Sequence, residues 1–173
     1  MPWKHVTPDL VAARPRWDLR QEIRLMLNTL LKSYNWYDHP EGPKFVETHR
    51  DAHRTSGHWL FLPGAFSAFH KVTNNEEIWA IHLGRLWVHV LTPEGRHEVL
   101  KLGLDFSSGE RPVVTVPVRY WQAAELPPGE PFAFGTNICA PGFLWTEFAL
   151  ADRAALSSEY PAHAELIARL TSK

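Results

Sequence analysis

The sequence predicts an all-β domain, a sandwich or a barrel, with an amphipathic helix before it and a short helical tail after it. Three observations predict this fold class. Between residues 44 and 148, short apolar stretches are separated by turn residues at even intervals. No helical pattern lies between these stretches, which argues against a parallel sheet. Helical spacing occurs instead near both ends of the 173-residue chain, which is long enough for one domain with a sizeable core.

The N-terminal part of the chain changes character at Asp18. Residues 1–17 hold three prolines and show no periodicity, so we expect an irregular arm. Residues 18–34 carry an apolar stripe behind Asp18, which can act as an N-cap, and they predict an amphipathic helix. Residues 38–43 contain two prolines and a glycine and cannot continue a regular element. The residues of the stripe are Leu19, Ile23, Met26, Leu27 and Leu30.

Ten segments of the central region have the length and composition of strands. The stretches between them contain pairs typical of turns, such as Pro63-Gly64, Asn74-Asn75 and Gly84-Arg85. Strands this short and this evenly spaced predict a barrel or a sandwich between residues 44 and 148. The expected strands are residues 44–50, 58–62, 66–72, 77–83, 86–91, 96–102, 113–116, 122–124, 132–139 and 143–148.

The last part of the chain, residues 152–170, predicts a helical tail. Asp152 can cap one helical turn, and Pro161 can open a last helix. The last helix would bury Leu166, Ile167 and Leu170.

The composition excludes several classes of protein. The formal net charge is −1 and charges of both signs are interspersed, so we expect neither a nucleic acid nor a membrane as partner. A single cysteine, Cys139, excludes an intrachain disulfide framework and is expected to be buried. No apolar leader and no apolar run of membrane-spanning length occurs, so we expect a cytoplasmic protein. Eight tryptophans and ten histidines are typical of small-molecule pockets.

The most informative stretch runs from Gly64 to Gly84. A glycine turn leads into a strand carrying His70, a short loop follows, and a second strand carries Glu77 before the next glycine turn. This layout would hold one imidazole and one carboxylate on facing strands. Strand alternation places Glu77 on one face with Trp79 and Ile81.

Alternation on the first of these two strands predicts the surroundings of His70. It places Phe66, Ala68, His70 and Val72 on one face. Among such apolar neighbours, we expect the neutral form of the His70 imidazole to be favoured.

Several short motifs of this chain, in this order, resemble those of the RmlC-like cupins, and more closely those of a small, poorly characterised cupin family. The resemblance implies a double-stranded β-helix (a cupin jelly roll) that usually dimerises, with a ligand pocket in the barrel. It does not imply a reaction, because cupins include enzymes of several classes and storage proteins. The matching motifs are His39-Pro40-Glu41-Gly42, Glu47-Thr48-His49-Arg50, Gly64 to His70, Glu76-Glu77-Ile78-Trp79, Val116-Pro117, Trp121-Gln122-Ala123-Ala124 and Ala140-Pro141-Gly142-Phe143.

The chain departs from the cupin pattern at two positions that usually bind metal. Val72 stands where the first motif has its second histidine, and Gln122 stands near the histidine of the second motif. An amide oxygen is a poor ligand for a transition metal. A site of His70, Glu77 and Gln122 would therefore hold a divalent metal only weakly, and we expect no tightly bound metal and no cofactor.

Other residues are candidates for ligand contact. Glu47 and His49 alternate with Thr48 and Arg50 along one early strand, and Arg50 could clamp a carboxylate or a phosphate. Aromatic side chains on strands are expected to wall the pocket, and Gln122 is expected to orient the ligand. His82, His89 and His97 lack metal-ligand spacing and are expected to be surface or core residues. The aromatic candidates are Trp59, Phe61 and Trp79.

These observations predict a homodimeric cupin that binds a small polar metabolite, which analogy of fold indicates is sugar-like. If it is an enzyme, His70 and Glu77 would act as an acid–base pair in an isomerisation, epimerisation or dehydration next to a carbonyl, without a metal. Two alternatives remain open at this point. One is a metal-dependent oxygenase or lyase, and the other is a non-catalytic binding or storage module.

Overall fold

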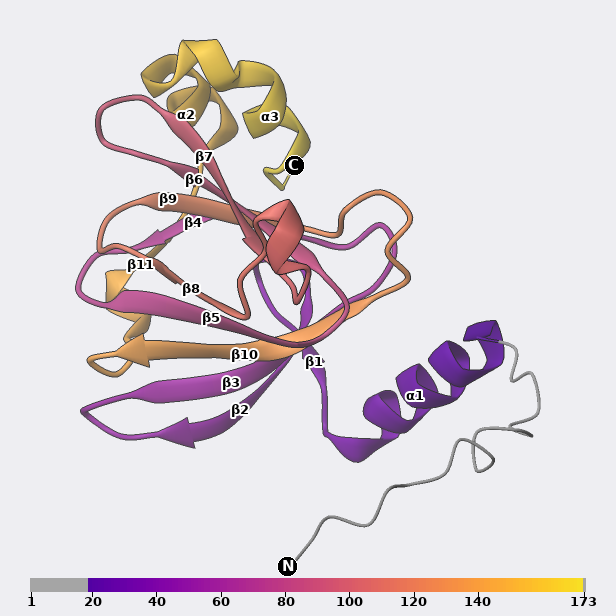
Figure 1. Cartoon of the computed structure of the whole chain (residues 1–173). Helices are drawn as coiled ribbons and strands as arrows, with labels where there is room; N and C mark the ends of the chain where they lie inside the picture. Colours follow the sequence, from indigo (N-terminus) through magenta and orange to yellow (C-terminus); the bar gives the residue numbers. More distant parts are fainter. Residues whose placement is uncertain (1–18, 173) are drawn as a thin grey trace, which may run out of the picture. The chain divides into compact units, whose positions relative to one another are not determined.

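The computed structural model describes residues 19–172, and the chain contacts divide it into two units at Tyr34 and Asn35. In the first unit the described element is helix α1 (Leu19–Ser33), which confirms the expected N-terminal helix (Figure 1). The expected irregular arm of residues 1–17 and the Asp18 N-cap lie outside the described residues.

The second unit contains two antiparallel sheets that lie one above the other in Figure 1. The six-stranded sheet has the order β1-β2-β3-β10-β5-β8 and the five-stranded sheet the order β11-β4-β9-β6-β7. The strands of the first sheet are β1 (Tyr37–Asp38), β2 (Lys44–Arg50), β3 (Thr55–Phe61), β5 (Glu76–Leu83), β8 (Val113–Val116) and β10 (Ala133–Ala140). Those of the second are β4 (Phe66–Val72), β6 (Leu86–Leu91), β7 (His97–Leu102), β9 (Trp121–Glu125) and β11 (Phe148–Leu150).

The all-β prediction is confirmed, and nine of the ten expected strands are present, with small differences at their ends. The strand expected at residues 143–148 is wrong. In its place are a short 3₁₀ helix, Trp145–Glu147, and then β11. The reason is visible at Phe143, whose backbone bonds to side chains and not to a neighbouring strand. Its N–H donates to Thr55 Oγ1 (3.0 Å), and its carbonyl accepts from Arg50 Nη1 (2.7 Å).

Two apolar cores hold this unit together. The first fills the space between the sheets and includes Trp59, Phe61 and Trp79. Strand alternation accounts for it, since inward residues recur at every second position of β3 and β5. Burial of this apolar surface is the main stabilising contribution to the fold. The second core packs the outer side of the five-stranded sheet, including Phe69 and Leu91, against the C-terminal tail.

The C-terminal tail is helical, as predicted. Helix α2 (Arg153–Glu159) begins with Asp152 as its N-cap, whose side chain accepts from Ala155 N at 2.8 Å. A 3₁₀ turn (Pro161–His163) then opens α3 (Ala164–Arg169). Ile167 and Leu170 of this last segment are buried in the second core.

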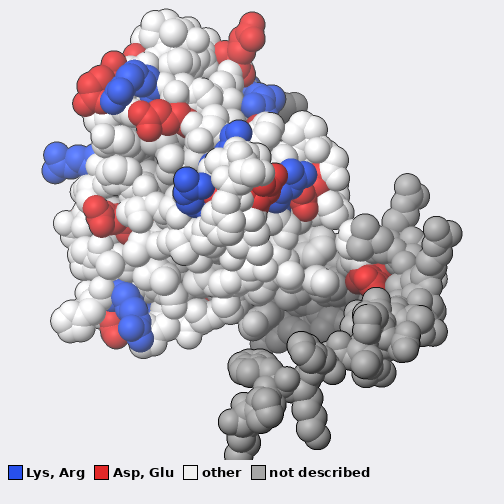
Figure 2. All heavy atoms as spheres, in the orientation of Figure 1, with Lys and Arg blue, Asp and Glu red and all other residues white. Residues whose placement is uncertain are grey.

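Charged side chains of both signs lie next to one another on the face of the molecule shown in Figure 2. Within residues 19–172, no helix is long and apolar enough to cross a membrane.

Candidate functional site

His70 enters the barrel interior because β4 is bulged. The pairing of β4 with β9 shifts register between Ser67 and His70. Within the bulge, Ala68 N–H donates to Glu41 O (2.8 Å) and Phe69 N–H to Leu170 O (2.7 Å). One extra residue reverses the alternation of a strand. Ser67 and His70 therefore both face Glu41.

The predicted face of β4 is wrong in its first part. Phe66 packs beside the second core, on the side of the helical tail, and not with His70. The prediction holds beyond the bulge, where His70 is completely buried and Val72 lines the pocket described below.

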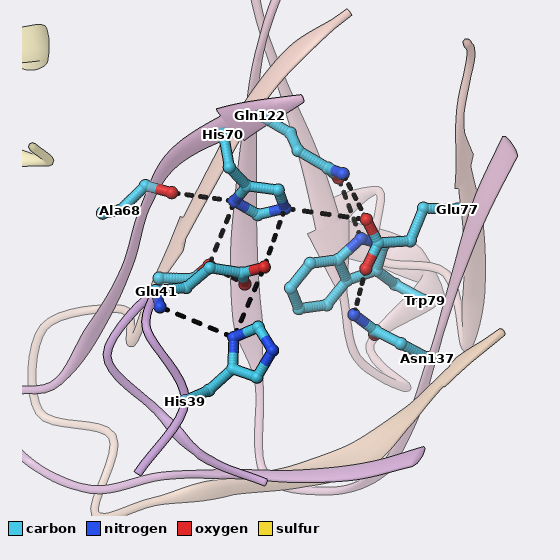
Figure 3. Close-up of polar contacts among 9 residues, drawn as sticks. His39, Glu41, Ala68, His70, Glu77, Trp79, Gln122 and Asn137 are labelled. Atoms are coloured by element: carbon cyan, nitrogen blue, oxygen red, sulfur yellow. Dashed lines mark hydrogen bonds and ion pairs between the residues drawn. The ribbon is translucent and has the colours of Figure 1, made fainter. Parts of the chain in front are cut away.

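The imidazole of His70 lies between two carboxylates (Figure 3). Its Nδ1 donates to the carbonyl oxygen of Ala68 at 2.8 Å, because that oxygen can only accept. Its Nε2 lies 3.6 Å from Glu41 Oε1 and 3.6 Å from Glu77 Oε2. Burial alone lowers the pKa of His70, but Glu41 and Glu77 outweigh burial and raise the pKa to about 9. The expected neutral imidazole is therefore replaced by a buried imidazolium.

Glu77 is held in place by two amide groups. Gln122 Nε2 and Asn137 Nδ2 each donate to one of its carboxylate oxygens. Trp79 Nε1 donates to Gln122 Oε1 at 3.0 Å. An indole N–H can only donate, so the Gln122 amide has one possible orientation, with its nitrogen toward Glu77. Gln122 was expected to orient the ligand, but here it positions Glu77 and lies behind the pocket wall.

Glu41 is a member of the site that the sequence analysis did not single out. It lies on the turn between β1 and β2, where Ser67 Oγ donates to its Oε2 at 2.8 Å. The next residue, Gly42, has φ +126°, and a Cβ there would lie 2.3 Å from Phe66 O. Glycine therefore lets this turn dock on the bulged strand. The available signal was the His39-Pro40-Glu41-Gly42 motif, which is part of the cupin resemblance but to which no side-chain role was assigned.

An open pocket lies over the two carboxylates of Glu41 and Glu77. The empty space in and above it, open solvent at the mouth included, is about 640 Å³. Seven of the eighteen lining residues carry an aromatic ring, histidine included. The lining residues are Tyr37, His39, Glu41, Pro43, Phe45, Glu47, Arg50, Thr55, Ser56, Gly57, Trp59, Val72, Glu77, Trp79, Asn137, Cys139, Phe143 and Trp145.

The mouth of the pocket carries stacked rings. Trp145 is 55% exposed and stacks on His39, with ring centroids 5.7 Å apart and planes 21° apart. Phe143 meets Trp145 edge to face at 5.0 Å. A half-exposed indole at a pocket entrance can stack on a ligand ring.

The pocket accounts for part of the expected ligand-contact set. Glu47, Arg50, Trp59 and Trp79 line it, as expected. Phe61 is not a lining residue and belongs to the first core.

His49 does not line the pocket, because β2 also contains a bulge. The pairing of β2 with β3 shifts register between Glu47 and His49, so Thr48 is the extra residue. The expected alternation of Glu47 with His49 is therefore wrong. Glu47 lies beside Arg50, while His49 Nε2 contacts Asp51 Oδ2 at 2.9 Å and does not line the pocket.

Arg50 is neutralised within the protein. Its Nε lies 3.0 Å from both carboxylate oxygens of Glu47, and its Nη2 lies 2.5 Å from Glu47 Oε2. Its Nη1 donates to Phe143 O at 2.7 Å. A guanidinium with these partners is less suited to clamp an anionic ligand than the sequence indicated.

The donor set does not fit the metal of the cupin pattern. Val72 is apolar and 3% exposed, and both ends of the Gln122 amide are already bonded to Trp79 and Glu77. Among residues 19–172, no group of three His, Cys, Asp or Glu side chains is arranged to hold a metal ion. The set of His70, Glu77 and Gln122 therefore does not form a three-ligand site.

Cys139 lines the pocket next to Glu77 in the β5–β10 pairing. It is buried, as expected. Burial, and then the carboxylates of Glu77 and Glu41, raise the pKa of its thiol well above the usual range. The thiol is therefore a poor nucleophile in this site.

Histidines outside the pocket are less scattered than expected. His89 Nδ1 and His97 Nε2 lie 3.0 Å apart across β6 and β7, and His89 Nε2 lies 3.1 Å from Glu125 Oε1. His163 of the tail continues the group, with its ring 5.6 Å from that of His97. Burial lowers the pKa of both His89 and His97.

Solved structures similar to this chain share its fold. Protein SO0799 from Shewanella oneidensis has a TM-score of 0.78 and 27% identity, over 84% of this chain and 96% of that one. A hypothetical protein from Leishmania major has a TM-score of 0.76 and 21% identity, over 87% of this chain and 98% of that one. Oxalate decarboxylase from Bacillus subtilis has a TM-score of 0.56 and 16% identity, over 80% of this chain and 38% of that one.

The predicted cupin jelly roll is confirmed by these likenesses. A comparison with curated proteins found no match. Residues 28–151 match the family described as cupin superfamily (DUF985), and the match covers more than half of the chain. With its two antiparallel sheets and its barrel pocket, the chain belongs to this cupin family.

Proposed function

We propose that this cupin binds a small polar metabolite, sugar-like in its hydroxyl and carbonyl groups, and transfers a proton at the carbon next to the carbonyl. One observation supports this best. Glu41 and Glu77 both line an aromatic pocket, and both lie 3.6 Å from Nε2 of the same buried imidazolium, His70. Such an arrangement supplies a base, an acid and a fixed positive charge.

The proposed reaction begins with one carboxylate, Glu41 or Glu77, taking the proton from the C–H bond next to the ligand carbonyl. The electron pair of that bond forms a carbon–carbon double bond, and the π pair of the carbonyl moves onto its oxygen, which gives an enolate. The positive charge of His70 stabilises the developing negative charge, and the low dielectric of the barrel strengthens this effect. Aromatic walls exclude water from the exposed carbon.

The proton then returns in one of three ways. Return to the other face of the same carbon is epimerisation. Return to the former carbonyl carbon is isomerisation, in which the proton of the neighbouring hydroxyl also moves to the former carbonyl oxygen. Loss of a hydroxide from the next carbon, with that proton, is dehydration. Because Nδ1 of His70 is bonded to Ala68, only its Nε2–H can exchange between Glu41 and Glu77. His70 can therefore carry a proton from one carboxylate to the other without bulk water.

We propose in addition that the protein is a cytoplasmic homodimer whose partners are a small molecule and a second copy of itself. The strand β8 supports the dimer, since it is the last strand of its sheet among residues 19–172 and its Val113 is 52% exposed. The interspersed charges in Figure 2 support the view that no nucleic acid is involved.

The test is deuterium exchange in D₂O with a panel of five- and six-carbon aldoses and ketoses, followed by proton NMR. Protein treated with a chelator should exchange the proton next to the carbonyl of at least one sugar. The variant Glu77→Gln should lower that rate by about 10²–10⁴-fold, the usual contribution of a general base. Glu98→Gln, on an exposed carboxylate beside Arg96, is the control and should keep the rate.

Two outcomes would replace this proposal. Exchange or turnover that is lost to chelator and restored by one metal would favour a metal-dependent oxygenase or lyase. Saturable sugar binding with no exchange in any sugar would favour a non-catalytic binding or storage module.

A further inference from the structure

A buried polar atom without a hydrogen-bond partner needs an explanation, and a ligand that bonds to it is one such explanation. Among residues 19–172, four buried side-chain atoms have no hydrogen-bond partner: Trp59 Nε1, His70 Nε2, Asn75 Oδ1 and Asn137 Oδ1. Trp59 and Asn137 belong to residues that line the pocket. Each such atom is costly to bury, by about 1–3 kcal/mol, unless something in the pocket bonds to it.

We infer that Trp59 Nε1 and Asn137 Oδ1 bind the ligand, and that they select a neutral molecule carrying a hydroxyl next to a carbonyl. The inference rests on the proposed function, since it names the kind of molecule that the same pocket accepts. It adds which two atoms recognise the ligand and which ligand charge the pocket disfavours.

The indole of Trp59 cannot turn to find another partner. Only 1% of Trp59 is exposed, and its ring meets Phe61 at 5.4 Å and Trp79 at 5.7 Å. On the opposite strand, a Cβ on Gly135 would lie 2.2 Å from the indole. The ring therefore fills a space that glycine leaves open, and its N–H direction is fixed.

The amide of Asn137 is fixed in the same way. Its Nδ2 donates to Glu77, whose carboxylate can only accept, so Oδ1 is the end that remains free. Trp59 is paired with Gly135 on β10, two residues before Asn137, so Trp59 and Asn137 are diagonal neighbours on one face. Side chains in this relation are about 7–8 Å apart along the sheet, so one small ligand can reach both.

The chemistry of the ligand follows from these two atoms. Trp59 Nε1 requires an acceptor, and Asn137 Oδ1 requires a donor. A carbonyl with a hydroxyl on the next carbon presents both within a few ångström. This pairing also brings the C–H bond next to the carbonyl close to Glu77, because Asn137 bonds to that carboxylate.

The charges of the pocket disfavour an anion. Glu41, Glu47 and Glu77 all line it, while Arg50, the only lysine or arginine among the lining residues that the structure describes, is bound by Glu47. The positive charge of His70 lies behind the wall, between Glu41 and Glu77. A carboxylate or phosphate on the ligand would face an excess of negative charge.

The experiment measures the indole and side-chain amide signals of the full chain by ¹H–¹⁵N NMR. The probes are dihydroxyacetone, which has a hydroxyl next to a carbonyl, glycerol, which lacks the carbonyl, and D-glycerate, which is an anion. Dihydroxyacetone should move the Trp59 indole proton downfield and shift the Asn137 amide with the same saturation. Trp87 and Trp121, which do not line the pocket, are internal controls whose signals should stay in place.

The comparison among probes decides the inference. Glycerol and D-glycerate should bind about tenfold more weakly or worse, as expected for a lost hydrogen bond or an added like charge. The variant Trp59→Phe keeps an aromatic ring and should weaken dihydroxyacetone binding by a similar factor, measured on the Asn137 signal. Dihydroxyacetone that leaves Trp59 unmoved, or D-glycerate that moves it equally well, would overturn the inference, and the wild-type spectra alone show this.

Failure of the proposed function gives a different result. If Trp59 and Asn137 respond selectively to dihydroxyacetone but no sugar exchanges its proton, the recognition stands and the proton-transfer proposal fails. If sugars exchange equally fast in wild type and Trp59→Phe, the proton-transfer proposal stands and the recognition fails.

Discussion

Glu41 Oε1 lies 3.6 Å from His70 Nε2 inside the barrel, although Glu41 belongs to a turn and His70 to a bulged strand. The contact gives His70 a second carboxylate in addition to Glu77. Burying the charge of an imidazolium costs free energy, and the two carboxylates together offset this cost. An ion pair on the surface has no such cost to offset, because its charges stay in water. This relationship determines the protonation of the site.

Substituting Glu41→Gln should lower the pKa of His70 from about 9, because burial then opposes only the Glu77 carboxylate. The side chain keeps its shape, and Ser67 can still bond to it. NMR titration of the His70 ring protons measures the change. Glu47→Gln is the matched control, since Glu47 lines the same pocket but is bound to Arg50, and it should leave the titration of His70 nearly unchanged. Equal titrations in both variants would show that Glu41 does not hold the proton.

Stability should decrease towards both high and low pH. The folded pKa of His70 is raised to about 9 from the ordinary 6.5, so its stabilising contribution is complete below about pH 6.5 and is lost as the pH rises through 9. A shift of this size corresponds to something on the order of 3 kcal/mol. His89 and His97 have lowered pKa values, so stability falls as the pH drops below their unfolded value of about 6.5. Urea unfolding from pH 5 to pH 10 tests both slopes.

The variant Glu41→Gln serves as the control for the alkaline slope. It should flatten the loss of stability between about pH 6.5 and pH 9 and leave the acidic slope unchanged. An alkaline slope of the same size in this variant would mean that another group causes it.

Restoring two histidines should create a metal site. The double variant Val72→His/Gln122→His places two imidazoles near His70 and Glu77, which gives the donor set typical of zinc and iron. We expect this variant to bind metal in a one-to-one ratio, while the wild type purifies with little. Elemental analysis without a histidine tag or chelator measures both. Stoichiometric metal in the wild type, with activity that depends on it, would show that the present donors suffice.

The C-terminal tail should contribute to the stability of the barrel. Ile167 has no exposed surface and packs in the second core with Phe69 and Leu91. Replacing it by alanine should cost about 2–5 kcal/mol of unfolding free energy. Leu104→Ala is the control, because Leu104 is 65% exposed and should lose little. Chemical denaturation of the two variants gives the comparison, and similar midpoints would show that the tail packs only loosely.

The protein should be a dimer in solution at micromolar concentration. The reason is the exposed edge of β8, which a jelly roll of this size commonly covers with a second copy. Static light scattering gives the mass directly. A mass near the 19.8 kDa of one chain would count against the proposal.

Much of the fold could be predicted from the sequence, because strand patterns and turn residues are local signals. The convergence of His70 and Glu77 was expected from alternation, and the Glu77 strand pairs regularly with β10 from Glu76 to Ile81. Alternation failed at Thr48 in β2 and between Ser67 and His70 in β4. Each bulge adds one residue and reverses which side chains face inward. No residue type at these two positions predicts a bulge.

The role of Glu41 could not be predicted from the sequence, for a different reason. A turn residue has no periodicity, so its side-chain direction depends on where the turn docks. Gln122 and Asn137 show the same limit, since their bonds to Glu77 follow from tertiary packing across two sheets. The sequence identified the amide at position 122 but not the indole that orients it.

The close approach of Gly42 to Phe66 has a consequence for how variants of this family should be interpreted. Gly42 has no side-chain atom to bond a ligand, yet a methyl group there would lie 2.3 Å from a backbone oxygen. Any larger residue must push the turn away from β4 and take Glu41 with it. A substitution at this glycine would therefore alter the pH optimum measured in an assay, an effect usually attributed to the loss of an acidic or basic side chain.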